Sequence, residues 1–124
     1  MSNHIDSSSA LKLCIKILNH WGCTTSQKAS ILGLSEFTLH KLILDAESPD
    51  LTTEQLERLS YIVNIHMALK STFSNIENVY GFMSMKNHNE FFSGRSPLSI
   101  IFEKSSSIHS LREVYRRIES IGKA

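Results

Sequence analysis

Histidine and cysteine are the residues of this chain whose chemistry could build a metal site. The six histidines stand at positions 4, 20, 40, 66, 88 and 109, and none is followed by another four residues later. His20 lies between Cys14 and Cys23, which is the nearest approach to a set of ligands. Zinc sites need closely defined ligand spacing, and Cys14 falls on the apolar face of a predicted helix, where free cysteine is common. We therefore expect no metal and no cofactor.

Catalytic motifs are also missing from the 124 residues. The chain contains no glycine-rich phosphate loop, no nucleophile elbow and no paired-carboxylate motif. His66 falls within the apolar stripe of a long predicted helix, which favours a packed, hydrogen-bonded core histidine over a catalyst. The sequence predicts that the chain is not an enzyme.

Composition places the chain among globular proteins, with 41% apolar and 20% charged residues. A length of 124 residues suits one ordinary domain or two very small ones. No window approaches the roughly 18 apolar residues of a membrane span, and the first residues lack an export signal. Two cysteines are too few for a disulfide framework, so we expect a cytoplasmic protein.

Charge is unevenly distributed along the sequence. The net charge is +1, but residues 91–124 hold six basic and three acidic side chains, whereas the two preceding segments, 1–50 and 51–90, are each slightly acidic. A basic final quarter indicates a surface that could meet acidic groups on a partner.

Apolar residues recur at helical spacing, and no strand pattern or internal repeat is apparent. We expect an all-α protein with a helix-turn-helix-like region at 1–50 and a second helical region at 51–124. Capping residues and breakers place the helices at about 9–20, 26–32, 35 to the mid-forties, 53–72, 75–83, 97–103 and 107–121.

Residues 25–42 fit a helix-turn-helix, with Ala29 at the helix crossing and Gly33 at the turn. We expect the second helix to bury Leu39, Leu42, Ile43 and either Phe37 or Thr38. The side chains that could meet DNA are Lys28, Ser35, His40 and Lys41. This face is a poor match to phosphates, because it carries two lysines offset by Glu36 and Asp45. Operator binding and a tri-helical packing unit therefore stay open as alternatives.

A sharp turn separates the last two helices from the rest of the chain. Gly94 tolerates backbone angles that a side chain would forbid, Ser96 can cap the next helix, and Pro97 suits its first position. We expect this turn to set the last two helices apart as a small unit and to present Arg95.

Residues 18–122 resemble, in the order and spacing of their parts, antitoxins of the Xre/MbcA/ParS type. The matching residues are Arg58, Leu59, Leu69, Phe73, Asn87, Phe92, Gly94, Ser96, Pro97 and Leu98. Phe82-Met83 stands where that family often has tryptophan, and the helix-turn-helix has few basic residues. The resemblance implies a RES-type or ParT-like partner toxin that uses NAD, whose cleft the C-terminal region covers, and often autorepression of the operon.

On this reading the toxin-binding residues are Arg95, Ser96, Arg112, Arg116, Arg117 and Lys123, while Gly94 and Pro97 shape the turn. The alternative is a solvated helix face with pairs such as Glu113–Arg117. The rival function is a DNA-binding regulator whose C-terminal half only dimerises. Broad apolar stripes in the first and fourth helices lead us to expect a homodimer, although both stripes could also belong to one core.

Overall fold

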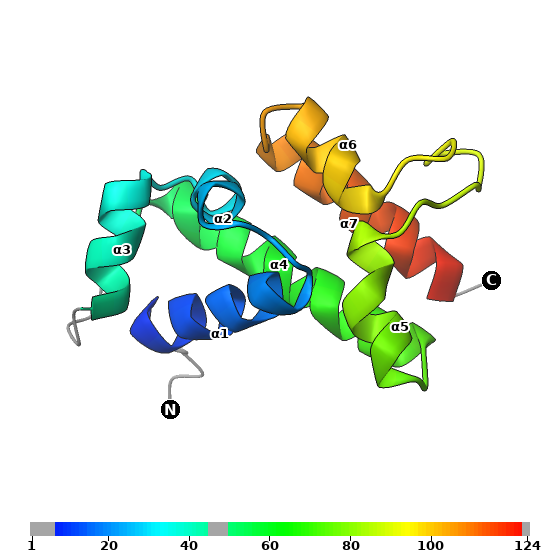
Figure 1. Ribbon diagram of the computed structural model, residues 1–124, viewed down its shortest axis with the longest axis horizontal. Helices are drawn as coiled ribbons and strands as arrows, with labels where there is room; N and C mark the ends of the chain where they lie inside the picture. The colour runs from blue at the N-terminus through cyan, green and yellow to red at the C-terminus, as the bar shows by residue number, and fades with distance from the viewer. Residues whose placement is uncertain (1–6, 45–49, 123–124) are drawn as a thin grey trace.

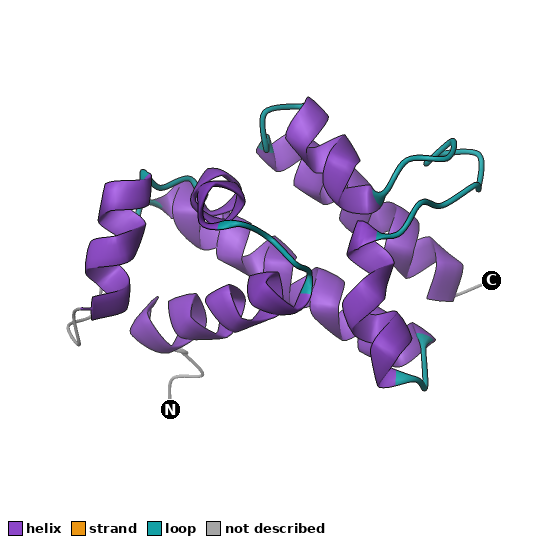
Figure 2. Ribbon diagram, viewed as in Figure 1, coloured by secondary structure: helices purple, strands orange, loops and turns teal. Residues whose placement is uncertain are grey.

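The computed structural model describes residues 7–44 and 50–122, and in these two ranges the secondary structure is helical with no strand (Figure 2). The expected all-α class is confirmed. The helices are α1 (Ser7–His20), α2 (Thr25–Leu32), α3 (Glu36–Leu44), α4 (Thr53–Thr72), α5 (Ile76–Gly81), α6 (Pro97–Glu103) and α7 (Ile108–Gly122), with a 3-10 turn η1 (Phe82–Ser84) after α5 (Figure 1). No helix of the described residues is long and apolar enough to cross a membrane.

Side-chain caps set the helix starts where the sequence placed them. Thr24 and Gln27 form a reciprocal capping box at α2, and Thr52 and Gln55 form another at α4. The hydroxyl of Ser96 accepts from the Ser99 amide, and Pro97 follows at the first helical position. These predicted helices therefore begin within about a residue of the observed ones.

Helix α4 is the central element of the fold (Figure 1). Helices α1 and α2 pack against it from the N-terminal half, and α7 packs along it from the C-terminal half. The largest fully buried side chains come from both halves: Trp21, Phe92, Leu18, Ile31, Leu32, Leu39, Ile62, Ile65, Leu69, Met83, Ile101 and Leu111. One hydrophobic core thus connects the two halves.

The expectation that the last two helices stand apart is wrong, because α7 lies along α4. The guanidinium of Arg112 donates to the Tyr61 hydroxyl at 2.9 Å, and the backbone of Gly122 approaches Thr72 so closely that a Cβ would lie 2.6 Å from its hydroxyl oxygen. Helix α4 contacts helices on both sides of residue 50, so its packing does not mark a boundary there. The division of the chain at residue 50 stays a prediction.

Helix α3 buries a narrower face than its apolar residues suggest. Leu39 is fully buried and Thr38 half-buried, but Phe37 and Ile43 are 78% and 51% exposed. The expectation that Ile43 lies in the core is therefore wrong, and of the pair Phe37 or Thr38 the inward one is Thr38. The reason is that α3 packs mainly on α2, so one stripe of its surface finds a partner.

Arg58 joins the two halves from a buried position on α4. Its Nη1 donates to the Ile31 carbonyl at the end of α2 (3.2 Å) and to the Ser106 carbonyl in the α6–α7 turn (2.5 Å). Its Nε and Nη2 donate to the Glu54 carboxylate at 3.2 and 3.0 Å. The hydroxyls of Ser30 and Ser106 share a 2.7 Å hydrogen bond beside it. One guanidinium therefore binds the helix-turn-helix to the C-terminal helices.

Candidate functional site

The helix-turn-helix consists of α2, a turn at Gly33, and α3. Gly33 adopts φ +73°, and a Cβ there would lie 3.1 Å from the Arg58 side chain, so both the backbone and the space favour glycine. The Ser35 hydroxyl caps α3 by accepting from the Thr38 amide at 3.0 Å. Ala29 is buried at the crossing. The predicted residues of this motif occupy the predicted places.

The four DNA candidates do not share one face. Lys28 donates to the Asn19 side chain of α1 at 2.6 Å and therefore lies beside α1. The hydroxyl of Ser35 is engaged with Thr38. His40 and Lys41 are exposed on α3, next to the exposed apolar side chains of Phe37, Ile43 and Leu44. The outer surface of α3 is thus more apolar than basic.

The loop before α6 is held by its own hydrogen bonds. The Asn87 amide donates to the Arg95 carbonyl at 3.1 Å, and the Gly94 amide donates to the Asn87 carbonyl at 2.8 Å. The Asn87 side chain accepts from the Asn89 amide. Ser93 and Gly94 adopt φ +52° and +83° to close the turn. This network fixes the two phenylalanines that precede the turn, one inward and one outward.

Phe92 is fully buried, whereas Phe91 is half-buried and separates two surface hollows. The larger, of about 390 Å³, is bordered by Arg95, Lys104 and His109, together with Phe91, Ile100, Ser110 and Glu113. The smaller, of about 280 Å³, is bordered by Asn89, Glu90, Phe91, Arg117, Ser120 and Ile121. The Arg117 guanidinium lies over the Phe91 ring, 4.7 Å from its centroid. We call the surface formed by Phe91, Arg95, Lys104, His109 and Arg117 the loop–α7 face.

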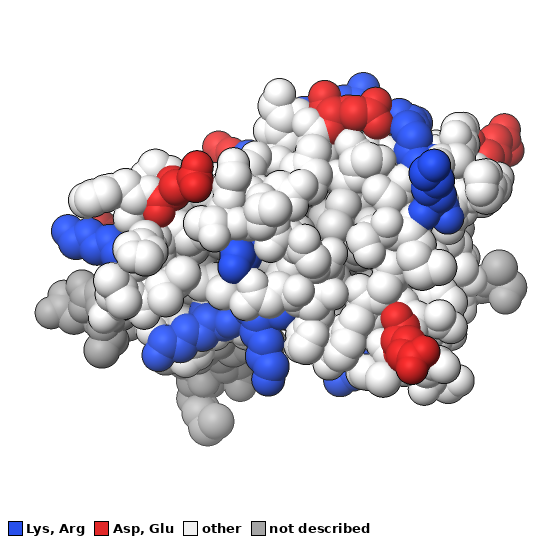
Figure 3. Space-filling model, viewed as in Figure 1, with Lys and Arg blue, Asp and Glu red and all other residues white. Residues whose placement is uncertain are grey.

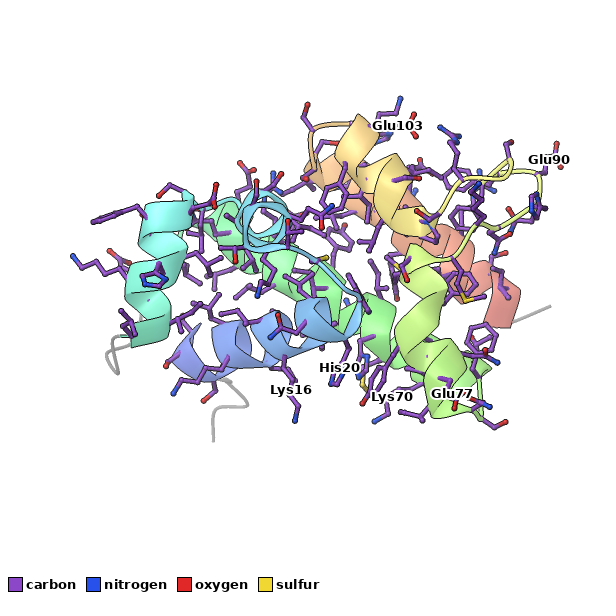
Figure 4. All side chains as sticks on the ribbon, in the orientation of Figure 1. Lys16, His20, Lys70, Glu77, Glu90 and Glu103 are labelled. Atoms are coloured by element: carbon purple, nitrogen blue, oxygen red, sulfur yellow. The ribbon has the colours of Figure 1, made fainter. Side chains whose placement is uncertain are left out.

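Nearby carboxylates pair with some of these cations. Arg95 Nη1 lies 3.1 Å from both oxygens of Glu103, which Figure 4 shows on α6. Glu113 lies 3.9 Å from the His109 imidazole, so the pair Glu113–Arg117 expected for a solvated face is replaced by Glu113–His109 and by Arg117 on Phe91.

A match over half of the chain shows the family to which it belongs. Residues 3–64, which include the described helices α1, α2 and α3, match the family model of the antitoxin Xre-like helix-turn-helix domain. The chain belongs to this family. No curated protein matches it in sequence.

The predicted toxin-binding residues of this Xre-like chain separate into groups. Arg95 and Arg117 border the hollows beside Phe91. Arg112 turns toward α4, where it pairs with Glu57 and Tyr61. Arg116 is exposed on α7, and the Ser96 hydroxyl caps α6. Lys123 lies outside the described residues.

Sequence reasoning does not identify Phe91, Lys104 and His109 of the loop–α7 face. The places of two adjacent aromatics in a loop, and of Lys104 at the end of α6 relative to His109 on α7, follow from tertiary packing. The one available signal was the paired Phe91-Phe92, of which only one could enter the core.

A stack of three rings connects α1, α4 and α5. The His20 and Tyr80 rings are parallel with centroids 3.8 Å apart, and the His66 ring is nearly parallel to Tyr80 at 6.4 Å. The expectation of a hydrogen-bonded His66 is wrong at one atom, since Nδ1 is buried and has no hydrogen-bond partner among the described residues. Burial, followed by Lys70 and His20, lowers the His66 pKa. Among the described residues no group of histidines, cysteines and carboxylates could hold a metal ion.

Proposed function

We propose that this chain is the antitoxin of a type II toxin–antitoxin pair and that it neutralises a RES- or ParT-like, NAD-using toxin by occluding its active-site cleft. The chain would act without turnover of its own. The family supports the proposal that the chain is an antitoxin. The side chains of the loop–α7 face support the proposal that the toxin binds there.

The observation that carries the proposal is the outward Phe91 under the Arg117 guanidinium. Aromatic and arginine side chains dominate binding energy at protein interfaces, because they bury large areas and lose little entropy when already held in place. Phe91 is held by the hydrogen-bonded loop, and Arg117 by a regular helix. The hollows on either side of Phe91 leave room for side chains of a partner.

The charge of this face suits a cleft that contains acidic catalytic groups. Arg95, Lys104 and Arg117 surround Phe91 and could pair with carboxylates of the toxin, which would then be unable to serve the substrate. Arg95 would need to exchange Glu103 for a partner carboxylate. That exchange is inexpensive, because both side chains of the pair are more than 40% exposed and solvent screens their attraction.

The test is co-expression of this chain with the product of the neighbouring gene, followed by co-purification and an NAD-consumption assay. Arg117→Glu, alone or with Arg116→Glu, should release NAD consumption by at least tenfold, because it removes a cation and leaves a like charge against the toxin's carboxylates. Lys16→Glu on α1 makes the same charge change away from the face and should not affect inhibition. Full inhibition by a folded Arg116→Glu/Arg117→Glu variant would refute the proposal.

We also propose that the chain is a homodimer joined through the outer face of α4. The exposed apolar side chains are Leu56 and Met67 of α4 and Leu13 of α1. Two hollows that share Asn64, of about 270 and 320 Å³, lie along α4. In a two-fold dimer these apolar side chains would be buried against the same side chains of a second copy.

The rival function is a DNA-binding regulator whose C-terminal half only dimerises. The apolar outer face of α4 would serve such a regulator as well as an antitoxin. The two differ in the co-expression experiment, because a regulator would neither retain the neighbouring gene's product nor change NAD consumption.

A further inference from the structure

The lysines of the N-terminal half gather on the side of the molecule away from the outer surface of α3. Lys12 and Lys16 are exposed on α1, four residues apart and therefore on one helical stripe, which His20 continues. Lys28 reaches this side through its bond to Asn19. In Figure 3 blue side chains gather along the lower edge, beneath α1. Of the lysines in α1, α2 and α3, only Lys41 lies on α3.

Lys70 extends the stripe from α4. It lies one helical turn after His66, whose ring belongs with Tyr80 and His20 to the stack at the end of α1. Figure 4 shows Lys16, His20 and Lys70 along one edge of the molecule, with Glu77 at its end. We call Lys12, Lys16, His20 and Lys70 the α1 edge.

The α1 edge is basic, and Glu77 is the carboxylate that Figure 4 shows at its end. Helix α1 contains no acidic residue, and in the described part of the chain none of the three lysines of the edge takes part in an ion pair. Three of the five arginines differ, since Arg58, Arg95 and Arg112 are each paired with a glutamate of the same chain. Unpaired lysines at successive turns form a surface that favours a polyanion.

We propose that the α1 edge binds the phosphate backbone of DNA, and that this edge rather than α3 supplies most of the electrostatic affinity. The inference goes beyond the proposed function, because it concerns DNA binding, and it does not depend on the toxin. A helix-turn-helix domain is a DNA-binding module in which helices other than the recognition helix commonly contact the backbone. Phosphate contacts position a protein without reading bases, which suits lysines and a nearby imidazole N–H donor.

Salt dependence tests the proposal, because each phosphate contact adds about 0.9 to the slope of log K against log salt. We would measure fluorescence anisotropy of labelled duplexes, one from upstream of the gene and one of unrelated sequence, between 50 and 200 mM salt. Lys12→Gln/Lys16→Gln should lower the slope by about 1.8 on both duplexes. Over that range the wild-type chain should lose about tenfold more affinity than this variant.

The controls separate this inference from its alternatives. Arg116→Gln/Arg117→Gln removes the same charge from α7 and should leave the slope unchanged, while Lys41→Gln tests α3. An equal decrease of the salt slope in both double variants would indicate a general charge effect and overturn the proposal. A loss confined to Lys41→Gln would overturn it in favour of α3. Binding to vesicles of anionic lipid without binding to DNA would also overturn it.

The toxin assay keeps this inference distinct from the proposed function. The Lys12→Gln/Lys16→Gln variant should inhibit NAD consumption as the wild-type chain does, whereas Arg116→Gln/Arg117→Gln should bind DNA normally and inhibit poorly. Each double variant is therefore the control for the other, and either proposal can fail while the other stands.

Discussion

Replacing Arg58 should destabilise the protein far more than replacing its ion-pair partner Glu54. Only one of the two side chains is buried, since Arg58 is 10% exposed and Glu54 62% exposed. Arg58→Ala removes the donor for two backbone carbonyls, of Ile31 and Ser106, in addition to the ion pair. Glu54→Ala leaves the guanidinium and both carbonyl bonds in place.

The magnitudes follow from these contacts. A hydrogen bond to a charged group contributes about 1.5–3 kcal/mol, and two are lost with Arg58, so we expect a loss of about 3–6 kcal/mol. The exposed half of the ion pair contributes about 0–1 kcal/mol, so Glu54→Ala should lower stability by about 1 kcal/mol or less. A chain of this length has a total stability on the order of 6–19 kcal/mol, so the first change removes a large share of it.

Urea unfolding followed by circular dichroism would measure both variants. With a slope of about 1.5 kcal/mol per molar urea, Arg58→Ala should lower the midpoint by about 2–4 M and Glu54→Ala by less than about 0.7 M. Arg58→Lys, which keeps the charge but not the forked donor geometry, should fall between them. Equal losses for Arg58→Ala and Glu54→Ala would show that the ion pair, and not the carbonyl bonds, carries the stabilisation, and would refute the reasoning.

Three further predictions concern His66, the two cysteines and the outer face of α4. The His66 pKa is lowered in the folded chain, so the unfolded chain takes up the proton first as pH falls below about 6.5. The urea midpoint should therefore be lower at pH 5.5 than at pH 7.5, and this difference should be smaller in His66→Phe. Burial raises the pKa of Cys14 to about 12 and of Cys23 to about 11. A thiol reagent at pH 8 should therefore label both only after urea unfolding, and rapid labelling of the folded chain would contradict their burial. Leu56→Asp should convert a dimer to a monomer in sedimentation experiments, whereas Phe37→Asp, on the equally apolar surface of α3, should not.

Much of the fold could be predicted from the sequence because its helices are marked by local signals. The capping pairs Thr24–Gln27 and Thr52–Gln55 act within four residues, and so do Ser96 and Pro97. Such signals set the beginning of a helix wherever it packs. The helix-turn-helix of the N-terminal half could be predicted from Ala29 and Gly33 for the same reason.

What could not be predicted depends on how helices far apart in sequence meet. Phe37 and Thr38 are neighbours on α3, and only the position of α2 decides which of them turns inward. Arg112 is as basic as Arg117, but its helical position faces Tyr61 of α4, whereas Arg117 faces Phe91. The candidate toxin-binding set therefore mixed residues of two flanks of α7, because periodicity gives the spacing of side chains on a helix but not its neighbours.

Helix α4 contacts helices of both halves, and this determines which experiments can separate toxin inhibition from DNA binding. Deleting residues 91–124 would remove α7, which covers one side of α4, and with it the buried Leu111, Val114 and Ile118. It would also remove the Ser106 carbonyl that Arg58 binds beside the end of α2. A truncated chain would thus lose inhibition because the contacts that hold α2 and α4 together are gone, whether or not the deleted residues touch a toxin. Single changes at exposed residues, such as Arg117→Glu and Lys16→Glu, leave those contacts in place. A loss of inhibition or of DNA binding in such a variant is therefore caused by the changed surface.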